Sequence, residues 1–206
     1  MADRAFDGRN TGAGAQDPHH FKLEYGPPGW DRTHIFTVGY IYNLPIFKRR
    51  SDLVGKGLGD WTFSGITVIE SGFAFAPGLG IGTPGLASRP NCSGSVTGPK
   101  SLTEWFNTGA FNAPAFGFFG SCGTGLIRGP GENTWNWALY KTFPIKERLK
   151  LQFRSEFFNI WNHPSFSAVS TTFAGRKADG TPLGNFGQVT SALDPRILEF
   201  ALRLDF

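Results

Sequence analysis

Apolar and polar residues alternate along several separate segments of the chain, and the clearest alternation lies at its carboxy-terminal end. In residues 198–206, leucine and phenylalanine occupy every second position, and polar or small residues stand between them. The apolar set is Leu198, Phe200, Leu202, Leu204 and Phe206. A period of two residues places alternate side chains on opposite faces of a β-strand. The pattern therefore predicts a strand with one apolar face and one polar face.

The same alternation predicts a strand over residues 147–158. Its apolar positions are Leu149, Leu151, Phe153 and Phe157, and its polar positions are Lys150, Gln152, Arg154 and Glu156. In a soluble antiparallel sandwich the apolar face would form the core. In an outer-membrane barrel it would contact lipid, and the polar face would line a wet lumen. The alternation alone leaves both fold classes open.

Three further strands are predicted at residues 33–44, 61–70 and 134–143, so the sequence predicts about five strands. The connections between them alternate in length, with long loops over residues 71–133 and 162–194 and shorter connections elsewhere. Outer-membrane barrels have short periplasmic turns and long extracellular loops. The alternation favours a barrel, with the end of the last strand on the periplasmic side.

The strand over residues 134–143 does not divide cleanly into two faces. Lys141 shares its parity with Trp135, Trp137 and Leu139. Either a β-bulge or a lysine at the membrane–water interface would account for this. The sequence does not decide between them, so the lipid or lumen parity of this strand stays open.

Composition favours β-structure over helix. The 206 residues include 21 phenylalanines, 28 glycines and 14 prolines, a content that suits strands joined by turns and loops. No stretch approaches the ~20 apolar residues of a transmembrane helix, so residence in a membrane would require β-strands. The net charge is only +4, and its one cluster is Lys48, Arg49 and Arg50, which we interpret as a solvated turn. We predict no nucleic-acid partner.

Residues that could support catalysis or bind a metal lack the spacing that such sites require. No Gly-x-Ser-x-Gly motif occurs, so a hydrolase has no support. Asp17, His19, His20 and His34 match no standard metal site. We predict no enzymatic activity, no metal and no cofactor.

The long connection over residues 71–133 contains both cysteines of the chain, Cys92 and Cys122. Two cysteines in a loop rich in glycine, proline and serine fit a disulfide formed in an oxidising compartment, and two free thiols are the alternative. Six aromatic residues at positions 105–119 of this connection either contact a ligand or pack inside the folded loop. They are Trp105, Phe106, Phe111, Phe116, Phe118 and Phe119.

Short motifs follow one another in order between residues 31 and 206. The first are Asp31-Arg32-Thr33-His34, Trp61-Thr62-Phe63-Ser64-Gly65, Ser71-Gly72, Trp105-Phe106-Asn107 with Ala110-Phe111, and Arg128-Gly129-Pro130-Gly131. The later ones are residues 153–159 (FRSEFFN) with Asn162-His163-Pro164, Phe186-Gly187-Gln188-Val189-Thr190, and Asp194-Pro195-Arg196. In order and spacing they resemble the carboxy-terminal barrel of Oar-like TonB-dependent receptors, a group common in Acidobacteria whose complete members carry a carboxypeptidase-regulatory-like domain.

The resemblance implies an all-β fold in which antiparallel strands form the carboxy-terminal portion of a transmembrane barrel in a Gram-negative outer membrane. Residues 1–31 would be a polar, flexible remnant of an extracellular loop, and residues 32–206 the barrel segment. Complete receptors take up a scarce, bulky solute with energy delivered through TonB. We find no plug, regulatory-like domain or signal peptide, and about five strands cannot close a barrel. We therefore expect a fragment that does not transport on its own.

The last strand, ending on Phe206, also resembles the segment that the barrel-assembly machinery recognises in outer-membrane proteins. The five apolar residues at 198–206 are therefore the expected residues of assembly and barrel closure. The implied partners are outer-membrane lipid, the assembly machinery, the rest of the receptor and, through that part only, TonB. The alternative is a soluble, secreted β-sandwich that acts as a carbohydrate-binding or adhesive module. The sequence does not identify the transported solute.

Overall fold

The computed structural model describes residues 16–17, 19–47, 52–80, 89–147 and 149–206, and the chain divides into two compact units. The sheet unit comprises Ile35–Ile69, Asn133–Ser165 and Leu193–Phe206. The loop unit comprises Met1–His34, Glu70–Glu132 and Phe166–Ala192. The basic cluster at residues 48–50 lies outside the described residues, so the predicted solvated turn stays a prediction. Residues 1–15 also lie outside them, so the predicted division at residue 31 stays a prediction.

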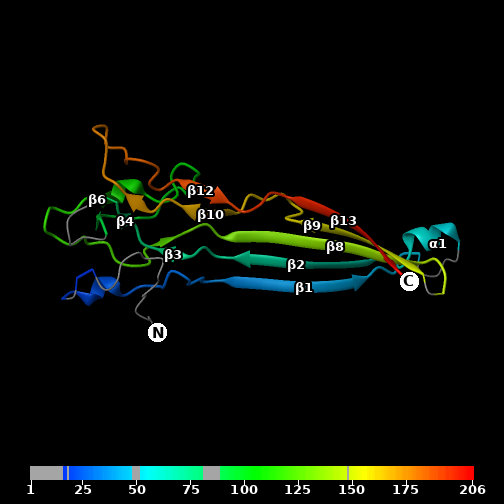
Figure 1. Cartoon of the computed structure of the whole chain (residues 1–206). Coiled ribbons are helices and arrows are strands. Elements are labelled where there is room, and N and C mark those ends of the chain that lie inside the picture. The colour runs from blue at the N-terminus through cyan, green and yellow to red at the C-terminus, as the bar shows by residue number, and fades with distance from the viewer. Residues whose placement is uncertain (1–15, 18, 48–51, 81–88, 148) are drawn as a thin grey trace. The chain divides into compact units, whose positions relative to one another are not determined.

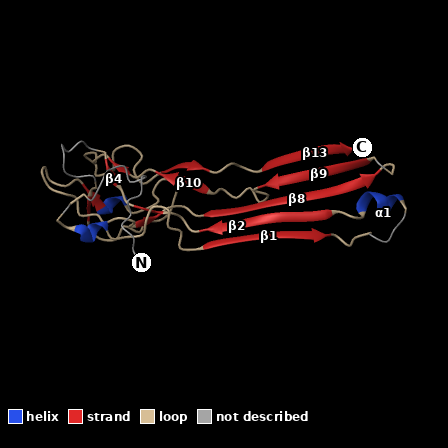
Figure 2. Ribbon diagram, turned by 60° about the horizontal axis from the view of Figure 1, so that its bottom comes forward, coloured by secondary structure: helices blue, strands red, loops and turns tan. Residues whose placement is uncertain are grey.

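Five strands form one sheet in the order β1-β2-β8-β9-β13 (Figure 1, Figure 2). They are β1 (Ile35–Asn43), β2 (Thr62–Glu70), β8 (Glu132–Pro144), β9 (Lys150–Phe158) and β13 (Ile197–Asp205). Each strand expected from the sequence is present, with its ends shifted by a few residues. The all-β, antiparallel fold is thereby confirmed, and the sheet is open, with β1 and β13 at its edges.

The register of the sheet brings the apolar positions of neighbouring strands onto one face. Leu198, Leu202 and Leu204 of β13 lie opposite Phe157, Phe153 and Leu151 of β9. Trp137, Leu139 and Phe143 of β8 lie opposite Phe157, Ser155 and Leu151 of β9. Residues that are directly opposite in an antiparallel pair share a face. We call this surface the apolar face.

Aromatic contacts extend the apolar face across β1 and β2. The Tyr40 ring stacks on Phe63 with ring centroids 5.7 Å apart, and Phe63 meets Trp137 edge-on at 5.3 Å. Gly65 makes the first contact possible, because a Cβ atom there would lie 2.6 Å from a carbon of the Tyr40 ring. A side chain at residue 65 would therefore displace Tyr40 from the face.

The connection between β1 and β2 contains a short helix, α1 (Leu53–Leu58), which the sequence did not predict. Its N-cap is Asp52, whose side chain accepts a hydrogen bond of 3.0 Å from the Gly55 N–H. Aspartate is a favoured N-cap because it satisfies a backbone donor that has no partner inside the helix. A second connection at this end of the sheet joins β8 to β9. It is a tight turn in which the Ile145 N–H donates to the Leu149 carbonyl at 2.8 Å.

The loop unit consists of short ladders around a small aromatic core. The ladders pair β3 (Ala74–Phe75) with β7 (Ile127–Arg128), β4 (Gly78–Leu79) with β11 (Thr172–Phe173), β5 (Asn91–Cys92) with β6 (Phe111–Asn112), and β10 (Phe166–Val169) with β12 (Val189–Ala192). Two 3₁₀ turns, η1 (Phe21–Glu24) and η2 (Thr108–Ala110), complete it. The core consists of Phe106, Ala110, Phe111, Cys122, Ile127, Phe173 and Phe186.

The candidate membrane-spanning sheet and its loop networks

The strands of the sheet have the length that a lipid bilayer requires. Four of them are 9 residues long and β8 is 13 residues long. A tilted transmembrane β-strand needs about 9–11 residues. Within the described ranges, no helix has the length and hydropathy needed to cross a membrane.

Large apolar side chains of the outer strand stand exposed on the apolar face. Phe200 is 66% exposed and Leu202 is 69% exposed. Their neighbours on β9 are apolar as well, so the exposed residues form a continuous patch and not scattered positions. A patch of this kind marks an interaction surface, and on a sheet with a charged opposite face it suits contact with lipid.

Aromatic residues gather at both ends of the apolar face. At the end that leads to the long connections, Trp161 meets Trp137 and Trp135 edge-on with centroid distances of 5.3 and 6.5 Å. At the turn end, Trp61 meets Phe153 at 5.9 Å. Membrane barrels carry aromatic girdles above and below an apolar band ~25 Å tall. On β8, the eight-residue step from Trp135 to Phe143 spans about 26 Å along the strand, which fits that band.

The other face of β9 and β13 carries charges of both signs. Arg154 donates to the Glu156 carboxylate at 2.5 Å, and Arg203 donates to Asp205 at 2.8 Å. Glu199 lies directly opposite Glu156 in the register, so Arg154 pairs with one of two neighbouring acids. A hydrated lumen lined with complementary charges has this composition.

Lys141 belongs to the apolar face, and no bulge is needed to place it there. The pairing of β8 with β9 runs without interruption from Trp137 to Pro144, and Lys141 lies opposite Phe153. The side chain is 4% exposed. Its Nζ donates to the carbonyl oxygens of Lys56 at 2.6 Å and Gly57 at 3.1 Å, and also to that of Gly59.

This arrangement satisfies all three protons of a buried ammonium group, which is costly to bury without partners. The acceptors belong to the carboxy-terminal end of α1 and the residue that follows it, where helix carbonyls lack partners of their own. The Nζ also lies 4.9 Å from the centre of the Phe143 ring. Only two separate features of the sequence indicated this contact: a lysine at an apolar position of a predicted strand, and a glycine-rich connection more than eighty residues earlier.

The five residues predicted to serve assembly and closure lie on and just after β13, at the open edge of the sheet. Phe206 follows the strand and is 98% exposed. The edge position leaves a row of backbone groups on β13 available to another strand. The role of these residues in assembly stays a prediction.

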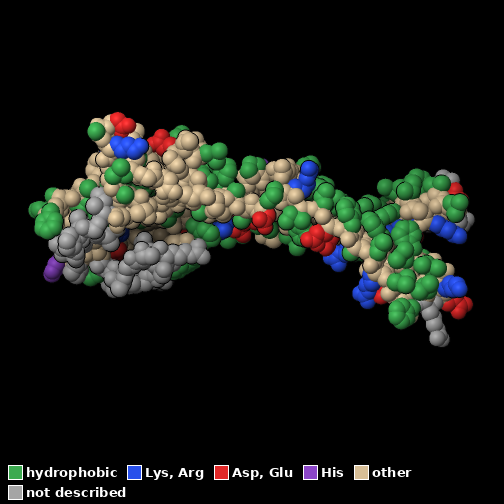
Figure 3. All heavy atoms as spheres, turned by 45° about the horizontal axis from the view of Figure 1, so that its top comes forward, with side chains coloured by type: hydrophobic (Ala, Val, Ile, Leu, Met, Phe, Trp, Pro, Cys, Tyr) green, Lys and Arg blue, Asp and Glu red, His purple; other side chains and the backbone are tan. Residues whose placement is uncertain are grey.

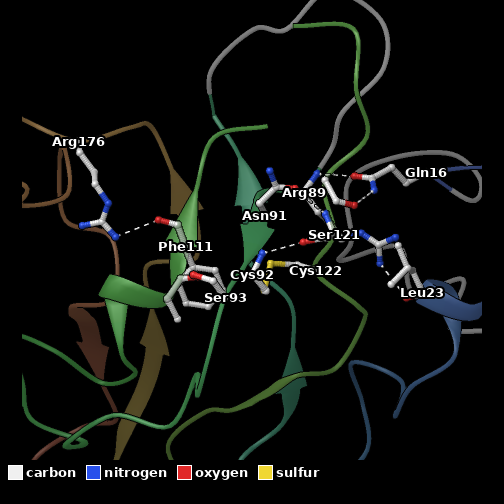
Figure 4. The surroundings of a disulfide bond; sticks show 12 residues. Gln16, Leu23, Arg89, Asn91, Cys92, Ser93, Phe111, Ser121, Cys122 and Arg176 are labelled. Atoms are coloured by element: carbon white, nitrogen blue, oxygen red, sulfur yellow. Dashed lines mark hydrogen bonds between the residues drawn. A yellow bond between two sulfur atoms is a disulfide. The ribbon is translucent and has the colours of Figure 1, made fainter. Parts of the chain in front are cut away.

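In the loop unit, Cys92 and Cys122 form a disulfide across 30 residues (Figure 4). Cys122 is fully buried in the aromatic core. Around the bond, the Cys92 N–H donates to the Ser121 hydroxyl and the Ser121 N–H donates to the Asn91 side chain, both at 3.0 Å. By the chain-entropy model, closing a loop of this length stabilises the fold by about 3–4 kcal/mol.

The structure separates the six aromatic residues at positions 105–119 by their burial. Phe106 and Phe111 are buried and pack edge-on against each other at 5.5 Å, as the packing alternative predicts. Trp105 is half-buried and donates its indole N–H to the Arg128 carbonyl at 2.9 Å. Phe119 is half-buried, whereas Phe116 and Phe118 are exposed around a turn.

Three arginines connect the segment before β1 to the end of β2 and the long connection that follows it. Arg128 donates to the Asp31 carbonyl at 2.8 Å and forms an ion pair with the carboxylate of the same residue. Arg89 pairs with Glu24, and Arg32 pairs with Glu70. In Figure 4, Arg89 also lies beside Gln16, whose side chain accepts a bond of 2.8 Å from the Arg89 N–H. The contact between Arg128 and Asp31 joins two motifs that are 97 residues apart.

A second network joins the end of β9 to the start of β13. The Asn159 side chain accepts from the His163 N–H at 3.0 Å and donates to the Asp194 carbonyl at 3.3 Å. The Asn162 side chain accepts from the Arg196 N–H at 3.0 Å. Both asparagines have a positive φ, a conformation that asparagine tolerates better than most residues. The network therefore explains why asparagine stands at both positions.

The histidines considered as metal ligands form no cluster in the described part of the chain, where no group of three or more His, Cys, Asp or Glu residues comes together. His20 Nδ1 lies 2.5 Å from a carboxylate oxygen of Asp17. The His19 backbone N–H, followed by this His20 contact, lowers the pKa of the Asp17 carboxyl. The pair is a local turn contact at the surface.

Comparison with known families agrees with this geometry. A family model described as an outer membrane beta barrel domain matches residues 1–199. Neither the curated proteins nor the solved structures give a match to the chain. The family places the sheet in the outer membrane, where its strands cross the bilayer. With its strand lengths, its apolar face and this match over nearly the whole sequence, the chain belongs to the outer membrane β-barrel domain family.

Proposed function

We propose that the chain is the carboxy-terminal barrel segment of an Oar-like TonB-dependent receptor, which takes up a scarce, bulky solute with energy delivered through TonB. In this proposal the segment supplies strands and extracellular loops, and the plug and the TonB-contacting part belong to other regions of the receptor. The segment has no enzymatic role. By itself it does not transport, because its sheet is open.

The observation that carries the proposal is that the motifs on which the resemblance rests contact one another. Asp31 of the first motif pairs with Arg128 of the fifth, and Asn162 accepts from Arg196 of the last. The backbone N–H of Trp105 donates to the Gly187 carbonyl at 2.7 Å, which joins two more motifs. Contacts between these motifs support a fold that is shared over residues 31–206.

The soluble sandwich is less well supported. A sandwich requires a second sheet against the apolar face, with the two inner faces forming a core. Among the described residues, the sheet unit contains a single sheet and α1. The buried aromatic core belongs to the loop unit.

The direction of the edge strands indicates what the rest of the barrel contributes. The arrows of β1 and β13 point the same way in Figure 2. The strands that close the barrel must pair antiparallel with both β1 and β13, so their number must be odd. Five strands and an odd number of further strands also give the even total of bacterial barrels. At least three are needed for the smallest barrel of eight. A ring of identical copies would instead create a parallel seam at each junction.

The proposal also gives β13 its partner during assembly. An open edge that ends on an exposed aromatic residue suits recognition by the barrel-assembly machinery, after which the same edge pairs with the first strand of the complete barrel. Outer-membrane lipid and the rest of the receptor are the remaining partners. No nucleic acid is involved.

The test is to translate the DNA upstream of the codon for Met1 in all frames. The proposal expects a signal peptide, a plug, a TonB-contacting segment and an odd number of further alternating strands. A gene that encodes the chain alone, together with a product that stays soluble without detergent and melts cooperatively, would contradict it and favour the sandwich.

A further inference from the structure

We propose that α1 and the residues beside it form a lipid-binding surface that continues the apolar face of the sheet into the headgroup region of the membrane. The proposal requires the sheet to span the outer membrane, and it does not depend on the identity of the receptor. Its ligand is the boundary between phospholipid headgroups and acyl chains, where short amphipathic helices bind.

The helix lies on the lipid-facing side of the sheet and not on the charged side. Lys141 is on the apolar face by register, and its Nζ bonds three carbonyls of α1 and the residues that follow it. Trp61 donates its indole N–H to the Gly57 carbonyl at 3.2 Å, while its ring contacts Phe153 of the apolar face. Two independent side chains of this face thus hold the same end of the helix.

The carboxy-terminal carbonyls of α1 would otherwise prevent such a placement. A helix end leaves carbonyl groups without intrahelical partners, and these groups are costly wherever water is scarce. Lys141 and Trp61 donate to the carbonyls of Lys56, Gly57 and Gly59. The Gly59 N–H itself donates back to the Gly55 carbonyl at 2.8 Å. The helix end is therefore compatible with a surrounding of low polarity.

Exposed apolar residues and one exposed lysine stand along the helix and the residues before it. Leu53 is 86% exposed and Leu58 is 56% exposed, and Val54, Ile46 and Phe47 beside them are exposed as well. Lys56 is exposed between the leucines. In Figure 3, hydrophobic side chains gather on the surface at the end of the sheet that bears α1. Leucine together with lysine suits acyl chains beneath anionic headgroups.

Continuity with the apolar face identifies lipid as the occupant. Trp61, Phe143 and Phe153 belong to the aromatic zone at this end of the apolar face, the zone that barrels place at the membrane–water boundary. A helix held over that zone lies at the depth of the headgroups. A protein partner at the same place would have to displace lipid that already covers the adjoining face.

The experiment uses the protein purified from outer membranes and reconstituted into vesicles of phosphatidylethanolamine and phosphatidylglycerol. An environment-sensitive fluorophore is attached to Leu53→Cys or Leu58→Cys, since the native cysteines are joined in a disulfide. Phe200→Cys is the control for lipid contact on the sheet, and Asp179→Cys, on an exposed turn of the loop unit, is the aqueous control. Quenching is compared between iodide in water and lipids that carry a nitroxide near the headgroup.

The proposal expects the probes at 53 and 58 to be quenched by the shallow nitroxide lipid and to be several-fold less sensitive to iodide than the probe at 179. Lys141→Met, which removes the donor to the helix carbonyls, should return the probe at 53 toward the iodide sensitivity of the aqueous control. Probes at 53 and 58 that behave like 179 while Phe200→Cys is quenched by lipid would overturn it. Loss of lipid quenching at 200 would overturn the membrane placement of the sheet, and the proposal with it.

Discussion

Leu202 of β13 lies directly opposite Phe153 of β9, and both side chains belong to the apolar face. The two residues are in strands whose alternation was found independently, so their pairing is a test of the faces assigned to each. A register shifted by one residue would place Leu202 opposite a polar position of β9 and expose leucines on the charged face. The observed register keeps lipid-facing positions together on both strands.

Reversing the chemistry of a single apolar-face position should impair insertion. We expect Phe200→Arg to cost roughly 2–4 kcal/mol, because Phe200 lies at the level of Leu139, midway between Trp135 and Phe143, where the guanidinium would face hydrocarbon. The neighbouring Ala201→Arg adds the same group to the charged face, where water and acids surround it, and should have little effect. The measurement is the fraction of protein recovered in the outer membrane and its heat-modifiable migration on gels. Equal loss in both variants would contradict the assigned faces.

Replacing Lys141 should destabilise the turn end of the sheet. Lys141→Met keeps much of the length of the side chain but leaves the carbonyls of Lys56 and Gly59 without their donor. We expect a loss of about 1–3 kcal/mol in the free energy of unfolding, the usual cost of an unsatisfied buried polar group. Unfolding by urea in detergent micelles measures it.

The matched control is Lys150→Met, since Lys150 is exposed on the charged face opposite Asp205. We expect that variant to change the free energy of unfolding by no more than about 0.5 kcal/mol. If the two methionine variants unfold alike, the hydrogen bonds from Lys141 do not stabilise the turn end.

Removing the disulfide should act on the loop unit. The double variant with Cys92→Ser and Cys122→Ser loses the constraint on the unfolded loop and should be less stable there by about 3–4 kcal/mol. We expect faster proteolysis between residues 89 and 128, and unchanged β-sheet signal in circular dichroism from the five long strands. Reduction of the native protein by dithiothreitol serves as a second route to the same state. A protease pattern that matches the native one would show that the ladders and the aromatic core suffice.

The two groups of loop phenylalanines should respond differently to truncation. Phe111→Ala removes a fully buried ring from the core and should cost about 3–5 kcal/mol. Phe116→Ala removes a ring that is 79% exposed and should change stability by no more than about 0.5 kcal/mol. Thermal unfolding monitored by fluorescence compares the two. A large loss from Phe116→Ala would show that this ring packs against a part of the protein.

The alternation of side chains determined the strands and their faces. The apolar positions of 198–206 and 147–158 placed β13 and β9 correctly because the period of two is a local property of an extended backbone. The tight turn after Pro144 and the long connections were also visible, since proline and glycine mark the ends of strands. For the same reason the all-β class and the open sheet could be predicted without a structure.

Only the tertiary structure decided where Lys141 goes, which motifs meet and that Cys92 and Cys122 bond. Lys141 finds its acceptors about eighty residues earlier, on a six-residue helix with two internal glycines that has too little periodicity to be predicted. The ladders of the loop unit are two to four residues long and exist through partners far along the chain. The alternation of apolar and polar residues is a property of neighbouring positions in the sequence. Contacts between distant residues depend on the folded arrangement that brings them together.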